Sequence, residues 1–367
     1  MSRSVVIAAG GTGGHIFPAQ ALGQELARRG HQVVLMTDDR GQNYAQSFPQ
    51  ARIVTVPSAT FAGRGLVGKG YAFVRLVRGA LAAYLALARI QPCVVVGFGG
   101  YPALPTMFAA ARRNLPSIIH EQNAVLGRVN RWLAPAVTRI ASTFPELTHV
   151  DDLIKARVAV TGNPVRPAVI ERAQPFQKPS VDLPFQLLVF GGSQGARVFA
   201  SLLPEAIGLL APPLRQRLRI VQQCRPEDLD AARTRYAGLG VNAELAAFFN
   251  NMGDLLATAH LVISRSGAST VTEECAVGRP AILIPYPFAM DDHQTANARQ
   301  VEAAGAAWMF AEKTLTAQIL AAKITELMEN PVLLETAAAK ALSLGRSDAA
   351  KRLADLVEEV GGLKAAA

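Results

Sequence analysis

The sequence predicts two doubly wound α/β domains, each built on a parallel sheet that helices cover on both faces. Three observations lead to this fold class. Short β-branched or apolar runs alternate with longer Ala- and Leu-rich stretches of helical length. The alternation stops in a proline-rich stretch at residues 161–185 and then begins again. Glycine-rich turns lie between a strand and a helix in both halves of the chain.

The expected strands are short and almost continuously apolar. In the first half they are at residues 5–9, 32–36, 53–56, 93–96, 117–120 and 139–141. In the second half they are at residues 186–190, 218–222, 241–246, 261–263 and 281–284. Strands that are apolar on both faces indicate a parallel sheet buried between two layers of helices.

The domain boundaries follow from the proline-rich stretch, which we interpret as an interdomain linker. We expect one domain at residues 1–163, a second at 164–342, and a terminal helix within 343–367 that packs back toward the first domain. A length of 367 residues also favours about two domains. In such architectures the cleft between the domains is the expected ligand site.

Composition excludes several classes of protein. Half of the residues are hydrophobic and 18% are charged, which is typical of a folded chain rather than a disordered one. Cys93, Cys224 and Cys275 are odd in number and form no CxxC pair, so neither a disulfide framework nor a cysteine zinc site is expected. Aromatic residues are only 6% and no recognition module is present, so nucleic acid is not an expected partner.

The positive charge belongs to the first half. Residues 1–163 hold 17 Lys and Arg against 7 Asp and Glu, whereas residues 164–367 hold 20 against 21. No acidic residue occurs between Asp39 and Glu121, where nine basic residues occur. Such a distribution suits an anionic partner or surface.

The densest basic segment, residues 64–89, is amphipathic if helical. Phe73, Val77, Leu81 and Tyr84 then form one stripe, and a second stripe is formed by Leu76, Ala80, Ala83 and Leu87. One face would cover the sheet and the other would lie on an anionic membrane. The residues expected at that surface are Lys69, Phe73, Arg75 and Arg78. The alternative is a solvated helix that only covers a sheet. The apolar run between Arg78 and Arg89 is shorter than the roughly 20 residues that span a bilayer, so a peripheral association is expected.

Three glycine-rich turns at strand ends are candidate phosphate sites, because backbone amides and a helix N-terminus attract anions. They contain Gly11 to Gly14, then Gly97, Gly99 and Gly100, and Gly191 to Gly195 with Ser193. The first turn lacks the dinucleotide fingerprint, since Ile16 stands where glycine is required, and no Walker A lysine follows. Asp38 alone remains compatible with a dinucleotide. Turns without a ligand are the other interpretation.

Polar residues after two later strands are candidates for contacts with sugar hydroxyls. Ser269 or Thr270 is expected to cap a helix with Glu273 in its first turn, where the carboxylate either stabilises the helix or binds a ribose. His293, Gln294 and Asn297 near another helix start suit sugar hydroxyls. No metal site is expected, because Asp291 and Asp292 have no second histidine nearby. Asp228 and Asp230 belong to what we interpret as a solvated helix start.

Two residues of the first half are candidate bases. His15 follows the first glycine turn, and Glu121 follows an expected strand. A histidine titrates near neutrality, and a partly buried glutamate with a raised pKa serves the same purpose. Either residue is equally compatible with a structural role.

Seven motifs together resemble a known family. In order they are "GGTGGHIFPA", "GFGGYPALP", "HEQNAVLGRVNRWLA", "GNPVR", "GGSQGAR", "SRSGASTVTE" and "HQTANA", and they cover nearly the whole chain. The sequence resembles the peptidoglycan N-acetylglucosaminyltransferases of glycosyltransferase family 28. The resemblance implies a GT-B fold and inverting transfer of GlcNAc from UDP-GlcNAc to the MurNAc 4-hydroxyl of lipid I, the undecaprenyl-pyrophosphoryl-MurNAc-pentapeptide, to form lipid II.

The resemblance also implies a division of labour. The N-terminal domain would bind the acceptor and the membrane, and the C-terminal domain would bind UDP-GlcNAc. The implied UDP-GlcNAc residues are Thr12, Gly13, Gly14, Asn123, Arg166, Ser193, Phe249, Ala268, Ser269, Thr270, Val271, Thr272, Glu273 and Gln294. Among them, Ser193 would meet the diphosphate, the Phe249 backbone the uracil, Glu273 the ribose and Gln294 the GlcNAc. The acceptor pyrophosphate would lie on Gly11, Thr12, Gly13, Gly14, Gly99 and Gly100.

The chain departs from the family at two positions. His293 stands where the family commonly has Gln, which leaves its sugar contact open. Phe249 replaces a smaller aliphatic residue, which is tolerable if only the backbone contacts the base.

In the implied chemistry His15 is preferred to Glu121 as the base, and neither a metal nor a cofactor is required. The implied location is the cytoplasmic side of the inner membrane, with cell-wall synthesis proteins as further partners. Three alternatives remain: another lipid glycosyltransferase, for example one acting on diacylglycerol; a UDP-GlcNAc 2-epimerase; and a UDP-sugar-binding membrane scaffold without catalysis.

Overall fold

The computed structural model describes residues 4–11, 13–39, 41, 48, 50–60, 65–192 and 196–363. Two of the expected site residues, Thr12 and Ser193, lie outside this part of the chain. The chain forms two compact units, which we describe separately. Unit 1 is Met1–Arg166 with Ser347–Ala367, and unit 2 is Pro167–Arg346.

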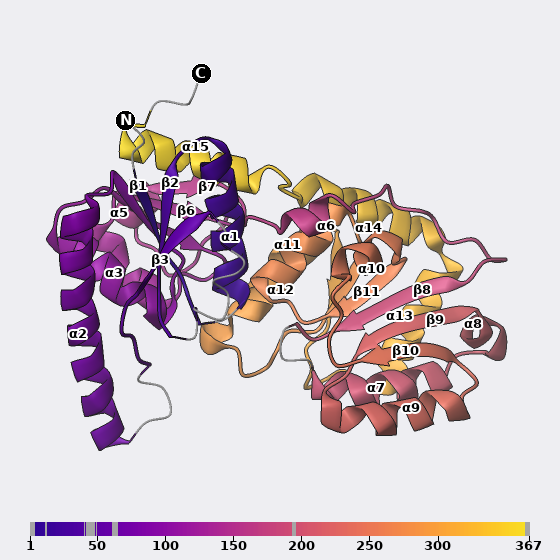
Figure 1. The fold of residues 1–367 in the computed structure, drawn as a ribbon. Helices are drawn as coiled ribbons and strands as arrows, with labels where there is room; N and C mark the ends of the chain where they lie inside the picture. The colour runs from indigo at the N-terminus through magenta and orange to yellow at the C-terminus, as the bar shows by residue number, and fades with distance from the viewer. Residues whose placement is uncertain are drawn as a thin grey trace. The chain divides into compact units, whose positions relative to one another are not determined.

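Unit 1 contains a seven-stranded sheet whose paired strands are all parallel, in the order β3-β2-β1-β4-β5-β6-β7 (Figure 1). The strands are β1 (Ser4–Ala8), β2 (Gln32–Thr37), β3 (Ala51–Thr55), β4 (Val94–Gly97), β5 (Ser117–Glu121), β6 (Arg139–Ser142) and β7 (Val158–Val160). Six of them confirm the sequence-based prediction to within two residues at each end. The short edge strand β7 was not expected.

The alternation of side chains along β1 shows why this sheet is apolar throughout. Val5 and Ile7 face the cluster that includes α1 (Gly13–Arg28) and α15 (Ala349–Gly361). Val6 and Ala8 face the cluster that includes α2 (Leu66–Ile90) and α3 (Gly100–Arg112). Neighbouring residues of a strand point to opposite faces, so a strand covered on both sides has no solvent-facing position. Two shorter helices, α4 (Arg128–Leu133) and α5 (Asp152–Lys155), complete the unit.

The terminal helix α15 belongs to unit 1, where an ion-pair network joins it to the residues that directly follow α1. The Glu358 carboxylate accepts hydrogen bonds from Arg29 Nη1 and His31 Nε2, both at 2.7 Å. Glu358 and His31 are each 8% exposed as side chains, so this network is held apart from solvent more than an ordinary surface pair. Val357 and Leu353 add an apolar contact to the same face.

The helix α2 runs over 25 residues, close to the segment 64–89 that the sequence indicated. Within the described residues, Val67–Ile90 is the stretch with the length and composition of a membrane-spanning helix, at a mean hydropathy of 1.4. The apolar run between Arg78 and Arg89 is thus part of a longer helix that also contains Lys69, Arg75 and Arg78. Ala83 and Leu87 are nevertheless fully buried in the core of unit 1.

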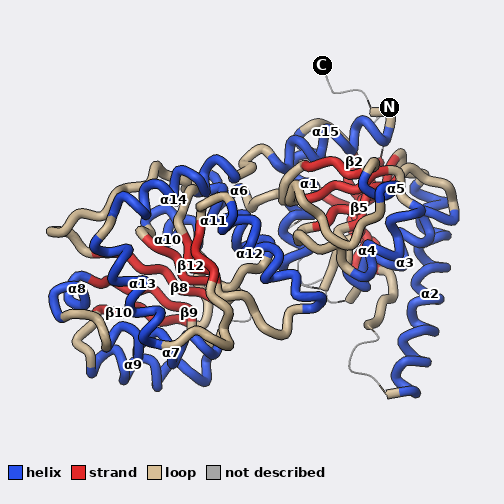
Figure 2. The backbone as a smooth tube through the Cα atoms, turned by 180° about the vertical axis from the view of Figure 1, so that it is seen from behind, coloured by secondary structure: helices blue, strands red, loops and turns tan. Residues whose placement is uncertain are grey.

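Unit 2 contains a six-stranded sheet in the order β10-β9-β8-β11-β12-β13, again with all pairs parallel. The strands are β8 (Phe185–Phe190), β9 (Leu218–Gln223), β10 (Asn242–Ala246), β11 (Leu261–Ser264), β12 (Ala281–Leu283) and β13 (Ala307–Met309). Five strands confirm the prediction, and β13 was missed. The tube view shows the strands of each unit enclosed by helices (Figure 2).

Helices cover both faces of this second sheet. One core cluster packs β8 against α7 (Arg197–Gly208) and α13 (Ala317–Glu329). The remaining helices are α6 (Pro167–Ile170), α8 (Pro212–Arg217), α9 (Leu229–Gly238), α10 (Met252–Thr258), α11 (Ala268–Val277), α12 (His293–Ala303) and α14 (Pro331–Leu344).

The stretch at residues 161–185 is not a free linker over its whole length. From Pro167 onward it belongs to unit 2, where α6 contacts α10 and α11. The fully buried Arg279 donates through Nη2 to the Gln174 carbonyl at 2.9 Å and through Nε to the Leu256 carbonyl at 2.7 Å. Its other donors reach the Ala257, Val277 and Gly278 carbonyls. One guanidinium therefore ties this stretch to the carboxyl ends of α10 and α11.

Candidate functional sites

The expected site of unit 1 lies at the carboxyl ends of three adjacent strands. β1 is flanked by β2 and β4, so the strand order reverses direction at the β1–β4 pair, and β5 follows. Such a switch point is where doubly wound sheets bind ligands. The turn after β1 leads to His15, the turn after β4 holds Gly99 and Gly100, and β5 ends at Glu121. The structure thus brings together four residues that the sequence predicted.

Gly100 lies against the imidazole of His15. Its φ of +69° is in the left-handed region, and a Cβ at this position would lie 3.3 Å from His15 Nε2. Gly11 has a φ of +84°, so the first turn also needs glycine. Gly100 therefore keeps the backbone close to the histidine at the start of α3.

A chain of hydrogen bonds begins at His15. Its Nδ1 is 3.1 Å from Gln122 Oε1, and Gln122 Nε2 donates to the Phe98 carbonyl at 3.1 Å. Gln122 Nε2 also lies 3.1 Å from His120 Nδ1, and His120 Nε2 lies 3.0 Å from the Gly162 carbonyl. His120 is completely buried, and burial lowers its pKa to about 4. The His120 imidazole is therefore neutral at pH 7.

The Glu121 carboxylate accepts four hydrogen bonds from the residues that follow it. Its Oε1 accepts from the backbone amide of Asn123 at 3.0 Å and from Asn123 Nδ2 at 3.2 Å. Its Oε2 accepts from the backbone amide of Gly127 at 2.9 Å and from Asn130 Nδ2 at 2.7 Å. Four donors fix the position of this carboxylate, which is 2% exposed. This geometry suits a structural role for Glu121.

Two other expected residues of unit 1 have contacts of their own. Asn123 is bound to Glu121, as above, and so belongs to the same loop. The Arg166 guanidinium lies over the ring of Phe17, 5.0 Å from its centroid. Asp38, which a dinucleotide would need for its ribose, instead accepts from the Gly41 amide at 3.1 Å.

The expected donor site of unit 2 also lies at a switch point, between β8 and β11. The glycine turn starts at Gly191, directly after β8. Its amide donates to Gln223 Oε1 at 3.3 Å, and Gln223 Nε2 donates to the Ala247 carbonyl at 3.2 Å. Gln223 ends β9 and so connects the glycine turn to the loop after β10. Phe249, which the resemblance places at the uracil, is buried in that loop, whereas Phe248 beside it is exposed.

The helix α11 carries the residues expected at the nucleotide. It begins at Ala268 with Gly267 as its N-cap, and no side chain caps it. The expected cap at Ser269 or Thr270 was therefore wrong, because the N-cap lies two to three residues earlier, and Glu273 consequently lies beyond the first turn. Ser269 Oγ is a buried hydroxyl without a hydrogen-bond partner in the described part of the chain. Val271 and Glu273 are buried, and Thr272 donates back to the Ala268 carbonyl.

Backbone contacts hold Gln294 in place on α12. Its Oε1 accepts from the Tyr286 amide at 2.9 Å, and its backbone carbonyl accepts from Ser266 Oγ at 2.8 Å. Asn297 Nδ2 donates to the Ser266 carbonyl at 3.0 Å, which links the turn after β11 to the same helix. The Gln294 amide group therefore presents its Nε2 as a donor. His293 has its Nδ1 2.8 Å from the Met290 carbonyl.

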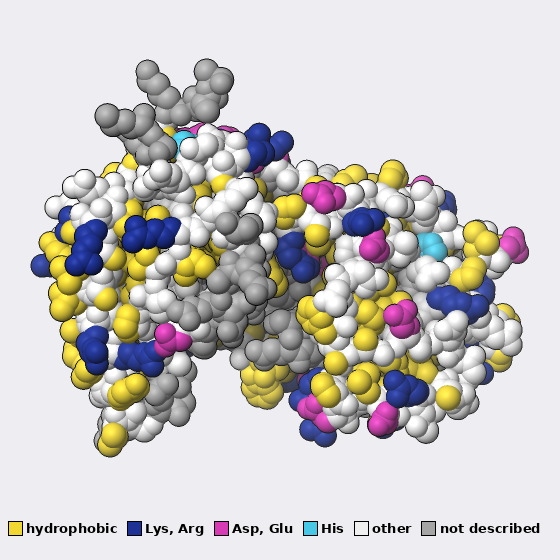
Figure 3. All heavy atoms as spheres, viewed as in Figure 1, with side chains coloured by type: hydrophobic (Ala, Val, Ile, Leu, Met, Phe, Trp, Pro, Cys, Tyr) yellow, Lys and Arg dark blue, Asp and Glu magenta, His cyan; other side chains and the backbone are white. Residues whose placement is uncertain are grey.

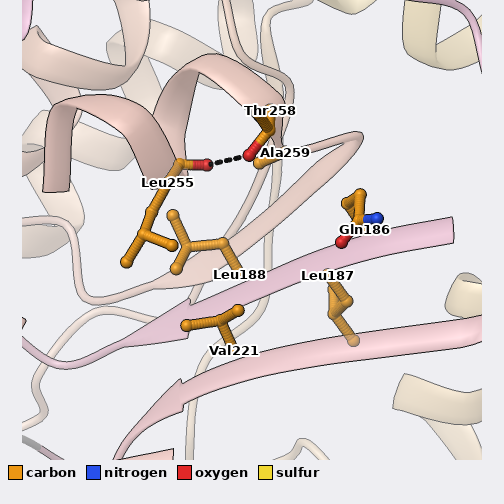
Figure 4. A pocket seen from close by; sticks show the side chains of 7 residues that line it. All are labelled: Gln186, Leu187, Leu188, Val221, Leu255, Thr258 and Ala259. Atoms are coloured by element: carbon orange, nitrogen blue, oxygen red, sulfur yellow. Dashed lines mark hydrogen bonds between the residues drawn. The ribbon is translucent and has the colours of Figure 1, made fainter. Parts of the chain in front are cut away.

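A separate pocket between β8, β9 and α10 has no role here. It has a volume of about 10 Å³, room for about one water molecule, and Leu188, Val221 and Leu255 line it (Figure 4). No group of three His, Cys, Asp or Glu side chains that could hold a metal occurs among the residues the structure describes. Asp228 and Asp230 are paired with Arg225 and Arg233.

The outer face of α2 is apolar and basic. Phe73, Val77, Leu81 and Tyr84 are 40 to 61% exposed. Hydrophobic and basic side chains occur together along this helix (Figure 3). The predicted division into an exposed stripe and a packed stripe is confirmed, since Ala83 and Leu87 are buried. Lys69 and Arg78 are exposed, whereas Arg75 is half-buried in an ion pair with Asp39.

Two Rossmann-like units, each with a glycine turn at its switch point, are the architecture of the GT-B fold of glycosyltransferases. A solved structure supports this assignment. MurG of Acinetobacter baumannii matches with a TM-score of 0.79 at 30% identity, covering 97% of this chain and 99% of that one. Residues 5–142 match the glycosyltransferase family 28 N-terminal domain, and residues 186–353 match its C-terminal domain. The chain belongs to glycosyltransferase family 28.

Curated relatives share a more specific name. A protein of Rhodospirillum centenum is 51% identical over 360 residues, which cover 98% of this chain and 95% of the relative. A protein of Rhodospirillum rubrum is 51% identical over 354 residues, covering 96% and 91%. Both are named UDP-N-acetylglucosamine–N-acetylmuramyl-(pentapeptide) pyrophosphoryl-undecaprenol N-acetylglucosamine transferase.

Sequence reasoning missed several residues that organise these sites. Gln122, His120 and Asn130 lie within the motif "HEQNAVLGRVNRWLA". The alternation of β5, continued one residue past its end at Glu121, places His120 and Gln122 on one face. Ser266 also lies within a motif, "SRSGASTVTE", but its partner Gln294 is 28 residues away on α12. Gln223 gave no comparable signal, because its partners Gly191 and Ala247 are 32 and 24 residues away along the chain.

Proposed function

We propose that this enzyme transfers GlcNAc, with inversion, from UDP-GlcNAc to the MurNAc 4-hydroxyl of undecaprenyl-pyrophosphoryl-MurNAc-pentapeptide. The observation that carries the proposal is the 51% identity, over 98% of the chain, to a relative named for this transfer. The placement of His15 and of the α11 residues at two switch points supports it. UDP-GlcNAc and lipid I are the proposed substrates.

In the proposed reaction His15 is the general base. The acceptor hydroxyl oxygen forms a bond to C1 of GlcNAc, the hydroxyl proton passes to the imidazole, and the bond from C1 to the diphosphate breaks with its electron pair on UDP. Glu121 is less suited to this step, because both of its oxygens already accept two hydrogen bonds each. A positioned base typically contributes about 10²–10⁴ in rate.

In unit 2 the same proposal assigns UDP-GlcNAc to the turn at Gly191 and to the residues 268–273 and Gln294. Backbone amides of the turn and the N-terminus of α7 would stabilise the developing charge on the diphosphate. Ser269 Oγ and Glu273, which are buried, would form hydrogen bonds with the nucleoside. Gln294 Nε2 would donate to a sugar hydroxyl. The acceptor pyrophosphate is assigned to Gly11, Gly13, Gly14, Gly99 and Gly100 in unit 1.

We further propose that α2 associates with an anionic membrane surface without crossing it. Apolar side chains and the exposed cations Lys69 and Arg78 share its outer face, a pattern typical of helices that lie in the interface. A spanning orientation would remove Ala83 and Leu87 from the core of unit 1, where both are fully buried.

The test is an assay of the purified chain with UDP-GlcNAc, with and without a lipid I analogue, in which UDP release and the disaccharide product are measured. We expect both only with the analogue, and we expect His15→Gln to abolish them while UDP still binds. Turnover with diacylglycerol alone, or UDP-ManNAc formed without an acceptor, would replace the proposal with a different enzyme. UDP binding without any turnover would indicate a scaffold.

A further inference from the structure

We propose that Gln122 is a positioning residue that fixes the tautomer of His15, with the proton on Nδ1 and the basic lone pair on Nε2. The geometry of unit 1 carries this inference by itself. Only its catalytic consequence rests on the proposed function, in which His15 takes the proton of the acceptor hydroxyl.

The orientation of the Gln122 side chain follows from its backbone partners. Its Nε2 lies 3.1 Å from both the Phe98 and the His120 carbonyl oxygens. A carbonyl oxygen only accepts, so the amide nitrogen, which only donates, must face this side. The reversed amide would set three oxygens against one another. The Gln122 Oε1 atom is therefore the one that faces His15.

This orientation determines which nitrogen of His15 carries the proton. Gln122 Oε1 lies 3.1 Å from His15 Nδ1 and has no hydrogen to give. Nδ1 must be the donor in this contact. A neutral imidazole carries one proton on its two nitrogens, so Nε2 keeps its lone pair.

The contacts of His120 require the same orientation of the Gln122 amide group. Its Nε2 lies 3.0 Å from the Gly162 carbonyl and must donate to it, which leaves His120 Nδ1 as an acceptor for Gln122 Nε2. Complete burial keeps this second imidazole neutral. The two hydrogens of Gln122 Nε2 are thus shared among acceptors only. Because the Gly162 carbonyl can only accept, it determines which atom donates and which accepts at each step from His120 through Gln122 to His15.

The surroundings of His15 are compatible with a base at Nε2. Gly100 approaches this nitrogen, and a side chain there would crowd it, since a Cβ would lie 3.3 Å away. The titratable groups that β5 contributes are His120, which is reached through Gln122, and Glu121, whose carboxylate faces Asn123, Gly127 and Asn130. The Gly99–Gly100 turn contributes none. When Nε2 takes the acceptor proton, Nδ1–H remains on Gln122 Oε1 and stabilises the imidazolium.

The direct test is the tautomer itself. The full chain, labelled with ¹⁵N-histidine, is examined by long-range ¹H–¹⁵N correlation at pH 8, and a His15→Gln variant assigns the signal. We expect the neutral His15 ring to carry its proton on Nδ1. A proton on Nε2 would overturn the inference. This readout does not require turnover, so it stands even if the proposed transfer activity is not found.

Kinetics give the second test. Gln122→Leu removes the acceptor for Nδ1–H, and we expect kcat to fall about 30-fold or more with little change in KM for UDP-GlcNAc. Gln122→Glu keeps an acceptor but adds a negative charge, which favours the protonated imidazole. The acidic limb of the kcat/KM profile should then move to higher pH by about one unit.

A matched variant separates positioning from mere stability. Gln222 is also a buried glutamine, and its Oε1 accepts from Tyr236 Oη at 2.5 Å in unit 2. We expect Gln222→Leu to leave the pH profile unchanged. An unshifted acidic limb in Gln122→Glu, or an unchanged kcat in a folded Gln122→Leu, would contradict the positioning role. If the wild-type chain transfers no GlcNAc, the proposed function fails and the labelling experiment alone decides this inference.

Discussion

Gln223 Oε1 accepts a hydrogen bond from the Gly191 backbone amide at 3.3 Å. The nitrogen of the same side chain donates to the Ala247 carbonyl at 3.2 Å, two residues before Phe249. One buried amide group therefore sets the spacing between the turn assigned to the diphosphate and the loop assigned to the uracil. A ligand that contacts both would depend on this spacing.

Gln223→Leu should weaken UDP binding and raise KM for UDP-GlcNAc about tenfold, with little change in kcat. Each of the two hydrogen bonds is worth about 1 kcal/mol net, and 1.4 kcal/mol corresponds to a factor of ten in affinity. Titration calorimetry with UDP and steady-state kinetics measure the two quantities. Gln222→Leu, on the opposite face of β9, is the control, and equal losses in both variants would refute the specific role of Gln223.

Glu121→Ala should lower the stability of unit 1 and abolish activity together. The substitution leaves the Asn123 and Gly127 amides and Asn130 Nδ2 without their acceptor, at a cost of about 3 kcal/mol or more. Differential scanning calorimetry should show a lower Tm, whereas His15→Gln should keep the wild-type Tm without activity. The decisive variant is Glu121→Gln. If it is as stable as wild type but inactive, the carboxylate takes part in proton transfer.

The fold was largely predictable from the sequence because buried parallel strands need unbroken apolar runs. Eleven of the strands correspond to such runs. β7 and β13 were missed because each has only three residues and lies at a sheet edge, so the apolar run is short and partly exposed. The start of α11 was misplaced because serine and threonine look like caps, whereas Gly267 holds that position.

The sequence indicated which residues belong to the candidate sites, but not which residues contact one another there. The motif around Glu121 indicated a functional residue. A glutamate at the end of a strand is, however, equally typical of a catalytic base and of a structural acceptor that holds a loop. Its partners Gly127 and Asn130 are six and nine residues away, and their approach depends on how the loop folds. Gln122 meets His15 only because β1, β4 and β5 are adjacent in the sheet. Such relationships are properties of the topology.

Changes on α2 should separate membrane association from donor binding. Leu81→Glu and Arg78→Glu should each weaken binding to phosphatidylglycerol vesicles, the second by about 1 kcal/mol or more because a surface cation is lost. Arg75→Glu should have a smaller effect, since Arg75 is already paired with Asp39. Vesicle co-sedimentation measures the binding.

The matched control for α2 is Val332→Glu on α14, at a side chain that is 58% exposed. It should not change vesicle binding, and none of these variants should change the affinity for UDP. Equal vesicle binding by wild type and Leu81→Glu would show that α2 is only a solvated cover of the sheet.

Glu274 should make the chain less stable as the pH rises. Burial raises the pKa of Glu274 to about 8, and the neighbouring Glu273 carboxylate adds to the rise. The folded state therefore holds the carboxyl neutral, while an unfolded chain ionises it near pH 4.5. The neutral carboxyl therefore contributes fully to the free energy of unfolding below pH 4.5, and this contribution is lost as the pH rises through about 8. Between these values the loss is at most about 1.4 kcal/mol per pH unit.

Glu274→Gln removes this titration while it keeps the shape of the side chain. Its stability relative to wild type should increase steadily from pH 5 to pH 8 and then level off, as measured by urea unfolding at each pH. The neighbouring thiol of Cys275, whose pKa burial raises, stays protonated throughout this range and does not contribute. A difference between the two proteins that is constant with pH would mean that Glu274 is ionised in the folded chain and has a partner for its charge.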